Sequence, residues 1–214
     1  MSVMAENESS TAAKEQKPNL IKRMLKSDKI GLVIALILII LVFSILTGNK
    51  YFTRQNIFNI LISSSIVGLV VIGECHLVIA GQIDLSPGSV AAFSGVLVSI
   101  LLANGLPLIV AMPAVVAFGF LIGLFNAVLV NKLRLEPFIA TLATMSIFRG
   151  LAYIICGGKA VFVTDALFLK LGAGRILGVP IPVIIFAVMF AMFIVILSRT
   201  RFGRSVYMTG GNSV

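Results

Sequence analysis

Long apolar runs, each about as long as a membrane-spanning helix, constrain this sequence more than any other feature. The first, at residues 30–47, contains no charged side chain. About 20 apolar residues in a helix cross the hydrocarbon core of a bilayer. Further runs lie at residues 57–80, 88–103, 107–130, 138–156 and 180–198. Because a backbone inside lipid must satisfy its own hydrogen bonds, these runs predict about six membrane-spanning helices.

The composition supports the same fold class. Apolar residues make up 59% of the chain and charged residues 12%, and the mean hydropathy is +1.11. Soluble domains contain roughly 45–50% apolar and about 25% charged residues. We therefore expect an all-α polytopic membrane protein with its transmembrane domain over residues 30–198. The connectors are too short to contain a soluble domain.

The distribution of Lys and Arg orients the chain. The 17 basic and 8 acidic residues give a net charge of +9, and the basic residues lie between the apolar runs. With the N-terminus inside, the inner segments carry eleven Lys and Arg and the outer segments carry five. Cytoplasmic segments carry the basic excess, so the N-terminus and residues 199–214 are expected in the cytoplasm. No basic stripe is interleaved with aromatic residues on a polar face, so nucleic acid is not an expected partner.

Two segments outside the apolar runs carry predictions of their own. Residues 1–29 form the N-terminal segment, which is polar up to residue 16 and expected to be disordered there. Residues 18–29 fit either a basic amphipathic helix lying on anionic membrane lipid or a plain basic flank of the first span. In the longest outer connector, residues 157–179, we expect a short helix at about 165–171.

The sequence shows no catalytic or metal-binding constellation. Cys75 and Cys156 lack CxxC spacing and the chain has one histidine, so neither a disulfide framework nor a metal site is expected. Residues 158–160, Gly-Lys-Ala, lack the spaced glycine and the Ser or Thr of a phosphate loop. We therefore expect no enzyme activity, no cofactor and no nucleotide hydrolysis by this chain itself.

Three ionisable residues lie inside the predicted spans: Glu74, His76 and Arg149. A charge at the bilayer centre costs about 2.5–3.5 kcal/mol on insertion scales, so it normally has a partner. A Glu74–Arg149 ion pair is one possibility, and a reach of Glu74 and His76 to the membrane interface is another. These residues keep an ion-coupled secondary transporter open as an alternative function.

Small residues form stripes along two spans. Gly119 and Gly123 precede Asn126 on one helix face. The stripe of the preceding span consists of Gly88, Ala91, Ala92, Gly95 and Ser99. Such stripes predict close helix packing, with Asn126 donating a hydrogen bond across the contact. A position of Asn126 on a permeation path is the alternative.

The connector at residues 81–89, Gly-Gln-Ile-Asp-Leu-Ser-Pro-Gly-Ser, is the most structured polar stretch between spans. Gly81 suits the end of one helix, and Asp84 or Ser86 suits the cap of the next, with Pro87 in its first turn. The end of one helix and the start of the next are sufficient to explain these residues. A helix break at membrane depth that lines a cavity is the alternative.

Several segments together resemble the permease subunits of bacterial ABC importers for monosaccharides, in the ribose, xylose and galactose branch. Residues 81–89 resemble the GGIDLSxGS signature of that family, and residues 123–126 with 137–145 resemble its G-x-x-N and PPFIxTLxTM stretch. Residues 148–158 and residues 202–212 also match in order and spacing. The resemblance covers about residues 51–214.

The resemblance implies a fold, a location and partners. It implies a helical domain of the bacterial plasma (inner) membrane that forms a homo- or heterodimer with a second permease subunit. It also implies an ABC ATPase subunit that binds ATP in the cytoplasm and an extracytoplasmic solute-binding protein. The segment expected near the ATPase contains Gly203, Arg204, Tyr207, Gly210, Gly211 and Asn212. The residues expected on the translocation path or in packing around it are Asp84, Ser86, Asn126, Thr141, Thr144 and Arg149.

The chain departs from the family pattern in ways that bear on its function. Gln82 replaces the second glycine of the signature, Glu136 stands where a neutral residue is usual, and residues 74–76 are more polar than usual. These departures leave the solute open among monosaccharides and other small polar molecules. Because residue 214 lies just before the expected coupling loop, we expect the N-terminal part of a truncated permease, which inserts but does not transport alone. A non-transporting membrane fragment is therefore the second alternative.

Overall fold

The computed structural model describes residues 29–211 of the chain. The chain divides into two compact units, with the boundary between Asn56 and Ile57. The first unit contains α2 (Lys29–Thr47), η1 (Gly48–Lys50) and the start of α3 (Arg54–Ile79). The predicted basic helix at 18–29 falls almost entirely outside the described residues, as does Asn212.

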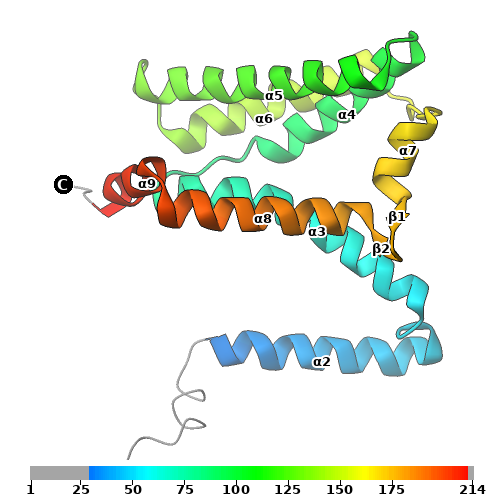
Figure 1. The fold of residues 1–214 in the computed structure, drawn as a ribbon. Helices are drawn as coiled ribbons and strands as arrows, with labels where there is room; N and C mark the ends of the chain where they lie inside the picture. Colours follow the sequence, from blue (N-terminus) through cyan, green and yellow to red (C-terminus); the bar gives the residue numbers. More distant parts are fainter. Residues whose placement is uncertain (1–28, 212–214) are drawn as a thin grey trace, which may run out of the picture. The chain divides into compact units, whose positions relative to one another are not determined.

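The second unit contains the rest of α3 and the elements that follow it (Figure 1). In chain order these are α4 (Pro87–Ala103), α5 (Leu108–Asn131), α6 (Pro137–Ile155), α7 (Ala166–Ala173), β1 (Arg175–Ile176), β2 (Val179–Pro180), α8 (Ile181–Arg199) and α9 (Arg201–Gly211). The two strands pair in an antiparallel hairpin two residues long on each side. The other regular elements of the described residues are helices, which confirms the all-α fold class.

Five helices are long and apolar enough to cross a membrane: α2, α3, α5, α6 and α8. The remaining predicted span, α4, is also apolar but has only 17 residues. Many large apolar side chains on these helices are exposed, including Phe120 at 71% and Val188 at 61%. Exposing an apolar surface of this extent to water is unfavourable, so these faces contact lipid.

Helices α4, α5 and α6 pack against one another through aromatic and aliphatic side chains. The ring of Phe93 stacks on Phe118 and meets Phe148 edge-on, with centroid separations of 5.3 Å in both pairs. Towards the other end of α4, Val98 packs with Ala111 and Val115 of α5 in a buried cluster. Aromatic pairs of this geometry contribute about 0.5–1.5 kcal/mol beyond their buried area.

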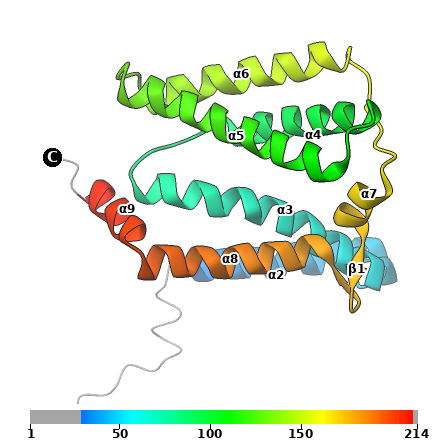
Figure 2. The same ribbon diagram turned by 45° about the horizontal axis from the view of Figure 1, so that its top comes forward.

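Helices α3, α8 and α9 meet through rings and closely spaced backbone. The imidazole of His76 on α3 meets the ring of Phe193 edge-on at 4.3 Å and stacks on Phe202 at 6.0 Å. Figure 2 shows α9 leaving the end of α8 towards the C-terminal end of α3. An added Cβ at Gly203 would overlap the backbone of Leu197, and one at Gly210 would overlap the Ile79 carbonyl. Glycine is therefore required at both contacts.

Two predicted helix boundaries are confirmed. Gly81 adopts a left-handed conformation with φ of 76°, and the N–H groups of Gly81 and Gln82 donate to the carbonyls of Val78 and Leu77. This pair of hydrogen bonds is the Schellman motif that ends a helix at glycine. The short helix expected at about 165–171 is α7, where Asp165 caps the first turn by accepting the N–H of Phe168 at 2.8 Å.

The glycine stripes do not pack as the sequence predicted. A Cβ added at Gly88, Gly95, Gly119 or Gly123 would meet nothing within 4 Å. Helices α4, α5 and α6 meet instead through larger side chains such as Phe93. Close helix approach occurs elsewhere, at Gly203 and Gly210.

Candidate functional site

A buried polar network joins α4, α5 and α6. The Nδ2 group of Asn126 on α5 donates to the hydroxyl of Ser86 at 3.1 Å, and its Oδ1 accepts from the Thr144 hydroxyl at 2.6 Å. All three residues are at most 5% exposed. Asn126 therefore donates across the helix contact, as predicted, and its carboxamide has partners on both neighbouring helices.

The connector between α3 and α4 is fixed to α6 by a second set of hydrogen bonds. Oδ1 of Asp84 accepts the N–H of Ser86 at 2.7 Å, which forms a tight local turn. The hydroxyl of Thr141 accepts the N–H of Leu85 at 3.2 Å and donates to the carbonyl of Pro137 at 2.8 Å. Residues of the two family-like segments, 81–89 and 137–145, therefore touch one another although they are far apart in sequence.

Ser86 does not cap α4 in the predicted way. It occupies the N-cap position, but its hydroxyl makes no capping hydrogen bond. The hydroxyl instead accepts from Asn126. Pro87, the first residue of α4, has no N–H and so leaves no unpaired donor at that position. The helix thus begins at Pro87, and the residue before it, Ser86, makes a tertiary hydrogen bond.

A cavity of about 340 Å³ borders this network. Its wall comes from the end of α3, the connector, α5, the start of α6, and α9. The lining residues are Leu77, Gln82, Ile83, Asp84, Gly123, Asn126, Ala127, Val130, Asn131, Pro137, Thr141 and Thr209. Apolar walls with a small number of polar groups are typical of small-molecule sites, whose volumes are about 300–1,000 Å³.

Gln82 is the unusual member of this lining. Its side-chain Oε1 is buried and has no hydrogen-bond partner within the described part of the chain. Buried polar atoms in proteins are nearly always hydrogen-bonded. In the sequence, Gln82 was singled out only as a departure from the family signature.

Arg149 and Glu74 are not brought together. Arg149 is exposed and lines a separate cavity of about 240 Å³ with Ala92, Val96, Ala152, Tyr153 and Cys156. Glu74 is half-buried on α3. The Glu74–Arg149 ion pair that the sequence left open is therefore not formed between these two residues. Arg149 also lies apart from the Asn126 network.

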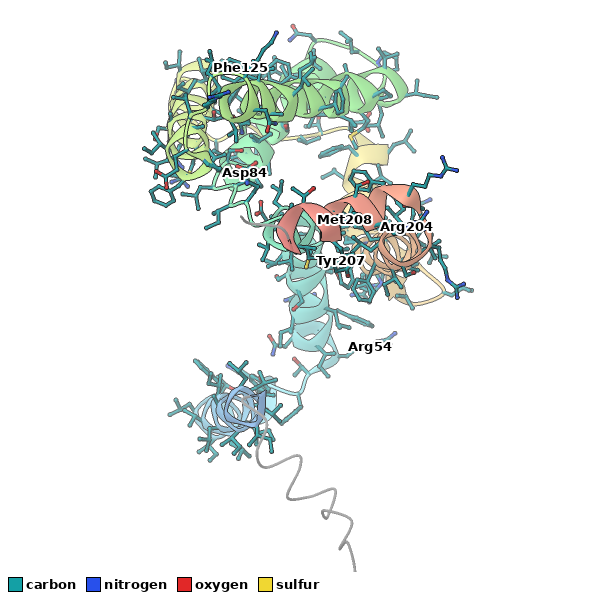
Figure 3. The ribbon with its side chains drawn as sticks, turned by 90° about the vertical axis from the view of Figure 1, so that its left-hand side faces the viewer. Arg54, Asp84, Phe125, Arg204, Tyr207 and Met208 are labelled. Carbon is teal, nitrogen blue, oxygen red and sulfur yellow. The ribbon has the colours of Figure 1, made fainter. Side chains whose placement is uncertain are left out.

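The residues expected near an ATPase lie on α9, apart from Asn212. Gly203 and Val206 are buried, whereas Arg204, Tyr207 and Met208 are exposed, with Tyr207 at 54% and Met208 at 74%. Figure 3 views this end of the second unit with α9 in front and Asp84 above it. One face of α9 thus rests on the protein while a basic and aromatic face points outward.

Residues 56–214 match the family described as the permease component of branched-chain amino acid transport systems. The chain belongs to this family. It is a multi-pass helical protein of the bacterial inner membrane, since it combines this membership with five helices able to span a membrane. No solved structure matches the chain.

Several curated relatives are named for sugar transport. The chain is 36% identical over 183 residues to the ribose import permease protein of Haemophilus influenzae, covering 84% of this chain and 56% of that protein. It is 34% identical over 186 residues to the D-allose permease of Escherichia coli, covering 86% and 57%. With the L-arabinose ABC transporter permease of Azospirillum brasilense it shares 35% over 167 residues, covering 78% and 49%. The chain thus spans about half the length of these relatives.

Proposed function

We propose that the chain is a permease component of an ABC importer that carries a monosaccharide-like solute into the cell. A separate ATPase subunit binds the ATP, and this chain catalyses no reaction itself. The observation that carries the proposal is the cavity beside the Ser86–Asn126–Thr144 network, which is built from segments 81–89 and 137–145. Relatives named for ribose, allose and arabinose transport support a sugar as the solute.

The network and the cavity have different roles in this proposal. Ser86, Asn126 and Thr144 hold three helices at fixed positions, since their polar groups satisfy one another inside the protein. Asp84 and Thr141 belong to the cavity wall, where a solute passes. Arg149 is assigned to neither role; it borders its own cavity between α4 and α6.

The orientation follows from the charge distribution. The cavity is lined by the end of α5 at Asn131 and by Thr209 of α9, and both segments adjoin clusters of Lys and Arg. The positive-inside rule assigns such segments to the cytoplasm. We therefore place the N-terminus and α9 in the cytoplasm and the cavity at the inner end of the path.

The partners follow from this orientation. The exposed face of α9, with Arg204 and Tyr207, is the surface for an ATPase subunit, and Gly203, Gly210 and Gly211 belong to the same segment. An extracytoplasmic solute-binding protein meets the opposite end, where α7 and the β1–β2 hairpin lie. A second permease subunit, identical or different, completes the transmembrane path, and lipid surrounds the remaining apolar faces.

Uptake measurements test the proposal. Cells lacking the gene for this chain are expected to lose uptake of at least one of radiolabelled D-ribose, D-allose and L-arabinose, and the restored gene is expected to return it. Uptake should require ATP and should survive Glu74→Gln. Uptake driven by an ion gradient in vesicles without ATP, and lost in Glu74→Gln, would contradict the proposal in favour of an ion-coupled carrier.

A further inference from the structure

We propose that Arg149 binds the phosphate of an anionic phospholipid, in the cavity of about 240 Å³ between α4 and α6. This lipid site is separate from the cavity beside Asn126, where the solute is proposed to pass. The observation that points to it is a charged side chain on a membrane-spanning helix that has no partner in the described part of the chain.

The position of Arg149 requires a partner of opposite charge. Arg149 lies on the apolar helix α6, six positions before its last residue, Ile155, which corresponds to about 9 Å along the helix axis. A guanidinium stays protonated in proteins, so loss of a proton cannot remove this charge. Charges within a membrane span are costly and normally pair with an opposite charge. An anion is therefore the expected partner of Arg149.

The described part of the protein does not supply this anion. No ion pair or hydrogen bond joins the Arg149 side chain to another residue within 29–211. None of the residues that line its cavity is acidic: Ala92, Val96, Arg149, Ala152, Tyr153 and Cys156. Because Arg149 is also exposed, its partner comes from outside the described residues.

The mixed character of the cavity favours a lipid over a free anion. Ala92 and Val96 on α4 and Ala152 on α6 form apolar walls. Tyr153 lies one turn nearer the helix end than Arg149, on the same face of α6, and is 65% exposed. Tyrosine is typical of the membrane–water interface, and a long arginine side chain reaches that level from a deeper backbone position. A phospholipid supplies a phosphate for the guanidinium and an acyl chain for the apolar walls, whereas inorganic phosphate supplies only the first.

The chemistry of the guanidinium favours an anionic head group. Arginine binds phosphate oxygens through two parallel N–H donors. In a zwitterionic lipid the amine of the head group competes with arginine for the same phosphate, whereas phosphatidylglycerol carries no such amine. Lys159, in the connector after α6, adds a further positive charge near this helix end. One basic residue near a membrane surface favours anionic lipid by about threefold to tenfold.

Native mass spectrometry of the purified full chain tests the site. The protein is held in a neutral detergent with equal amounts of phosphatidylglycerol and phosphatidylcholine, and the bound lipids are counted per protein. Arg149→Gln removes the charge, and Arg149→Lys keeps the charge but not the two parallel donors. Lys170→Gln removes an exposed charge from α7, outside the cavity, and is the matched control. Circular dichroism checks that each variant keeps its helix content, and a further sample contains an excess of inorganic phosphate.

The expected result is a preference for phosphatidylglycerol that depends on Arg149. Wild type and Lys170→Gln should retain phosphatidylglycerol over phosphatidylcholine by about threefold to tenfold, Arg149→Lys by less, and Arg149→Gln should show no preference. Equal retention of the two lipids by wild type, or the same ratio in wild type and Arg149→Gln, would overturn the inference.

Two other results would assign the site to a different anion and also overturn the lipid inference. Displacement of phosphatidylglycerol by the excess of inorganic phosphate would indicate a site for a free anion. Loss of association with a second permease subunit in Arg149→Gln, with the lipid ratio unchanged, would indicate that a carboxylate of that subunit pairs with Arg149.

Discussion

The cavity lies between two groups of helices, here called walls, and each group is held together in a different way. On one side, α4, α5 and α6 are joined by the Ser86–Asn126–Thr144 network and by the rings around Phe93. On the other, α3, α8 and α9 meet through the His76 ring and through backbone contacts at two glycines. Helices in a membrane lack a hydrophobic driving force for association, so such packing and hydrogen bonds are what hold each wall.

The difference lies in how completely the polar groups are satisfied. Among the described residues, the buried side-chain atoms without a hydrogen-bond partner are Nε2 of His76 and Oε1 of Gln82. Both lie on α3 or directly after it. The buried side-chain polar atoms described on α4, α5 and α6 therefore all have hydrogen-bond partners, whereas one such atom on α3 and one in the connector after it have none.

The largest expected effect is on the wall formed by α3 and α9. Gly210→Ala places a methyl group against the Ile79 carbonyl, which is backbone and cannot move aside as a side chain can. Overpacking of this kind typically costs about 1–3 kcal/mol, and here we expect the upper end with α9 displaced from α3. Trypsin cleavage after Arg201 and Arg204 in the purified protein should become several-fold faster, and sugar uptake should fall at least tenfold.

The neighbouring glycine provides a matched control. A Cβ at Gly211 would meet nothing within 4 Å, so Gly211→Ala is expected to leave the rate of trypsin cleavage unchanged. If Gly210→Ala and Gly211→Ala behave alike, the close backbone contact of α9 with α3 is not what holds this wall.

An intermediate effect is expected in the network between α4, α5 and α6. Asn126→Ala removes a hydrogen-bond partner from the buried hydroxyls of Ser86 and Thr144. Thr144 can still donate to the Ala140 carbonyl, so the loss falls mainly on Ser86. Leaving a buried polar group unpaired costs about 1–3 kcal/mol, and interhelical hydrogen bonds measured in a membrane protein average about 0.6 kcal/mol. The free energy of unfolding in detergent should therefore fall by about 1–3 kcal/mol.

The control for this substitution is Ser146→Ala, which removes an exposed hydroxyl bonded only to the preceding turn of α6. It should change the free energy of unfolding by less than about 0.5 kcal/mol. An Asn126→Ala protein as stable as Ser146→Ala would show that the network does not distinguish this wall from the other.

The sequence predicts the helices and several of their ends but not their contacts. Uninterrupted apolar runs predict membrane-spanning helices because a backbone in lipid must satisfy its own hydrogen bonds. Gly81 predicts a helix end because glycine adopts the left-handed conformation easily. The sequence also selected Ser86, Asn126 and Thr144, and the structure places them together. These features depend on local chemistry and on spacing along one helix.

What the sequence could not predict is which small residues face a neighbour. Gly119 and Gly123 have the spacing of a packing motif, yet a Cβ added at either would meet nothing within 4 Å. Gly203 and Gly210 lie seven residues apart and make close backbone contacts. The outcome depends on how α9 turns back onto α3, which is a tertiary property. The missing partner of Gln82 depends on the same arrangement and was invisible for the same reason.

The smallest expected effect sharpens this contrast between glycines. Gly119→Ala adds a methyl group where nothing lies within 4 Å, inside α5. Alanine favours a helix interior over glycine by about 0.5–1 kcal/mol, so the purified chain should unfold at an unchanged or slightly higher temperature. Gly95→Ala on α4 should behave in the same way. A loss of stability or uptake in Gly119→Ala, with Gly95→Ala unaffected, would show that another subunit packs on this stripe. The open face of α5 would then be an interface rather than a lipid-facing surface.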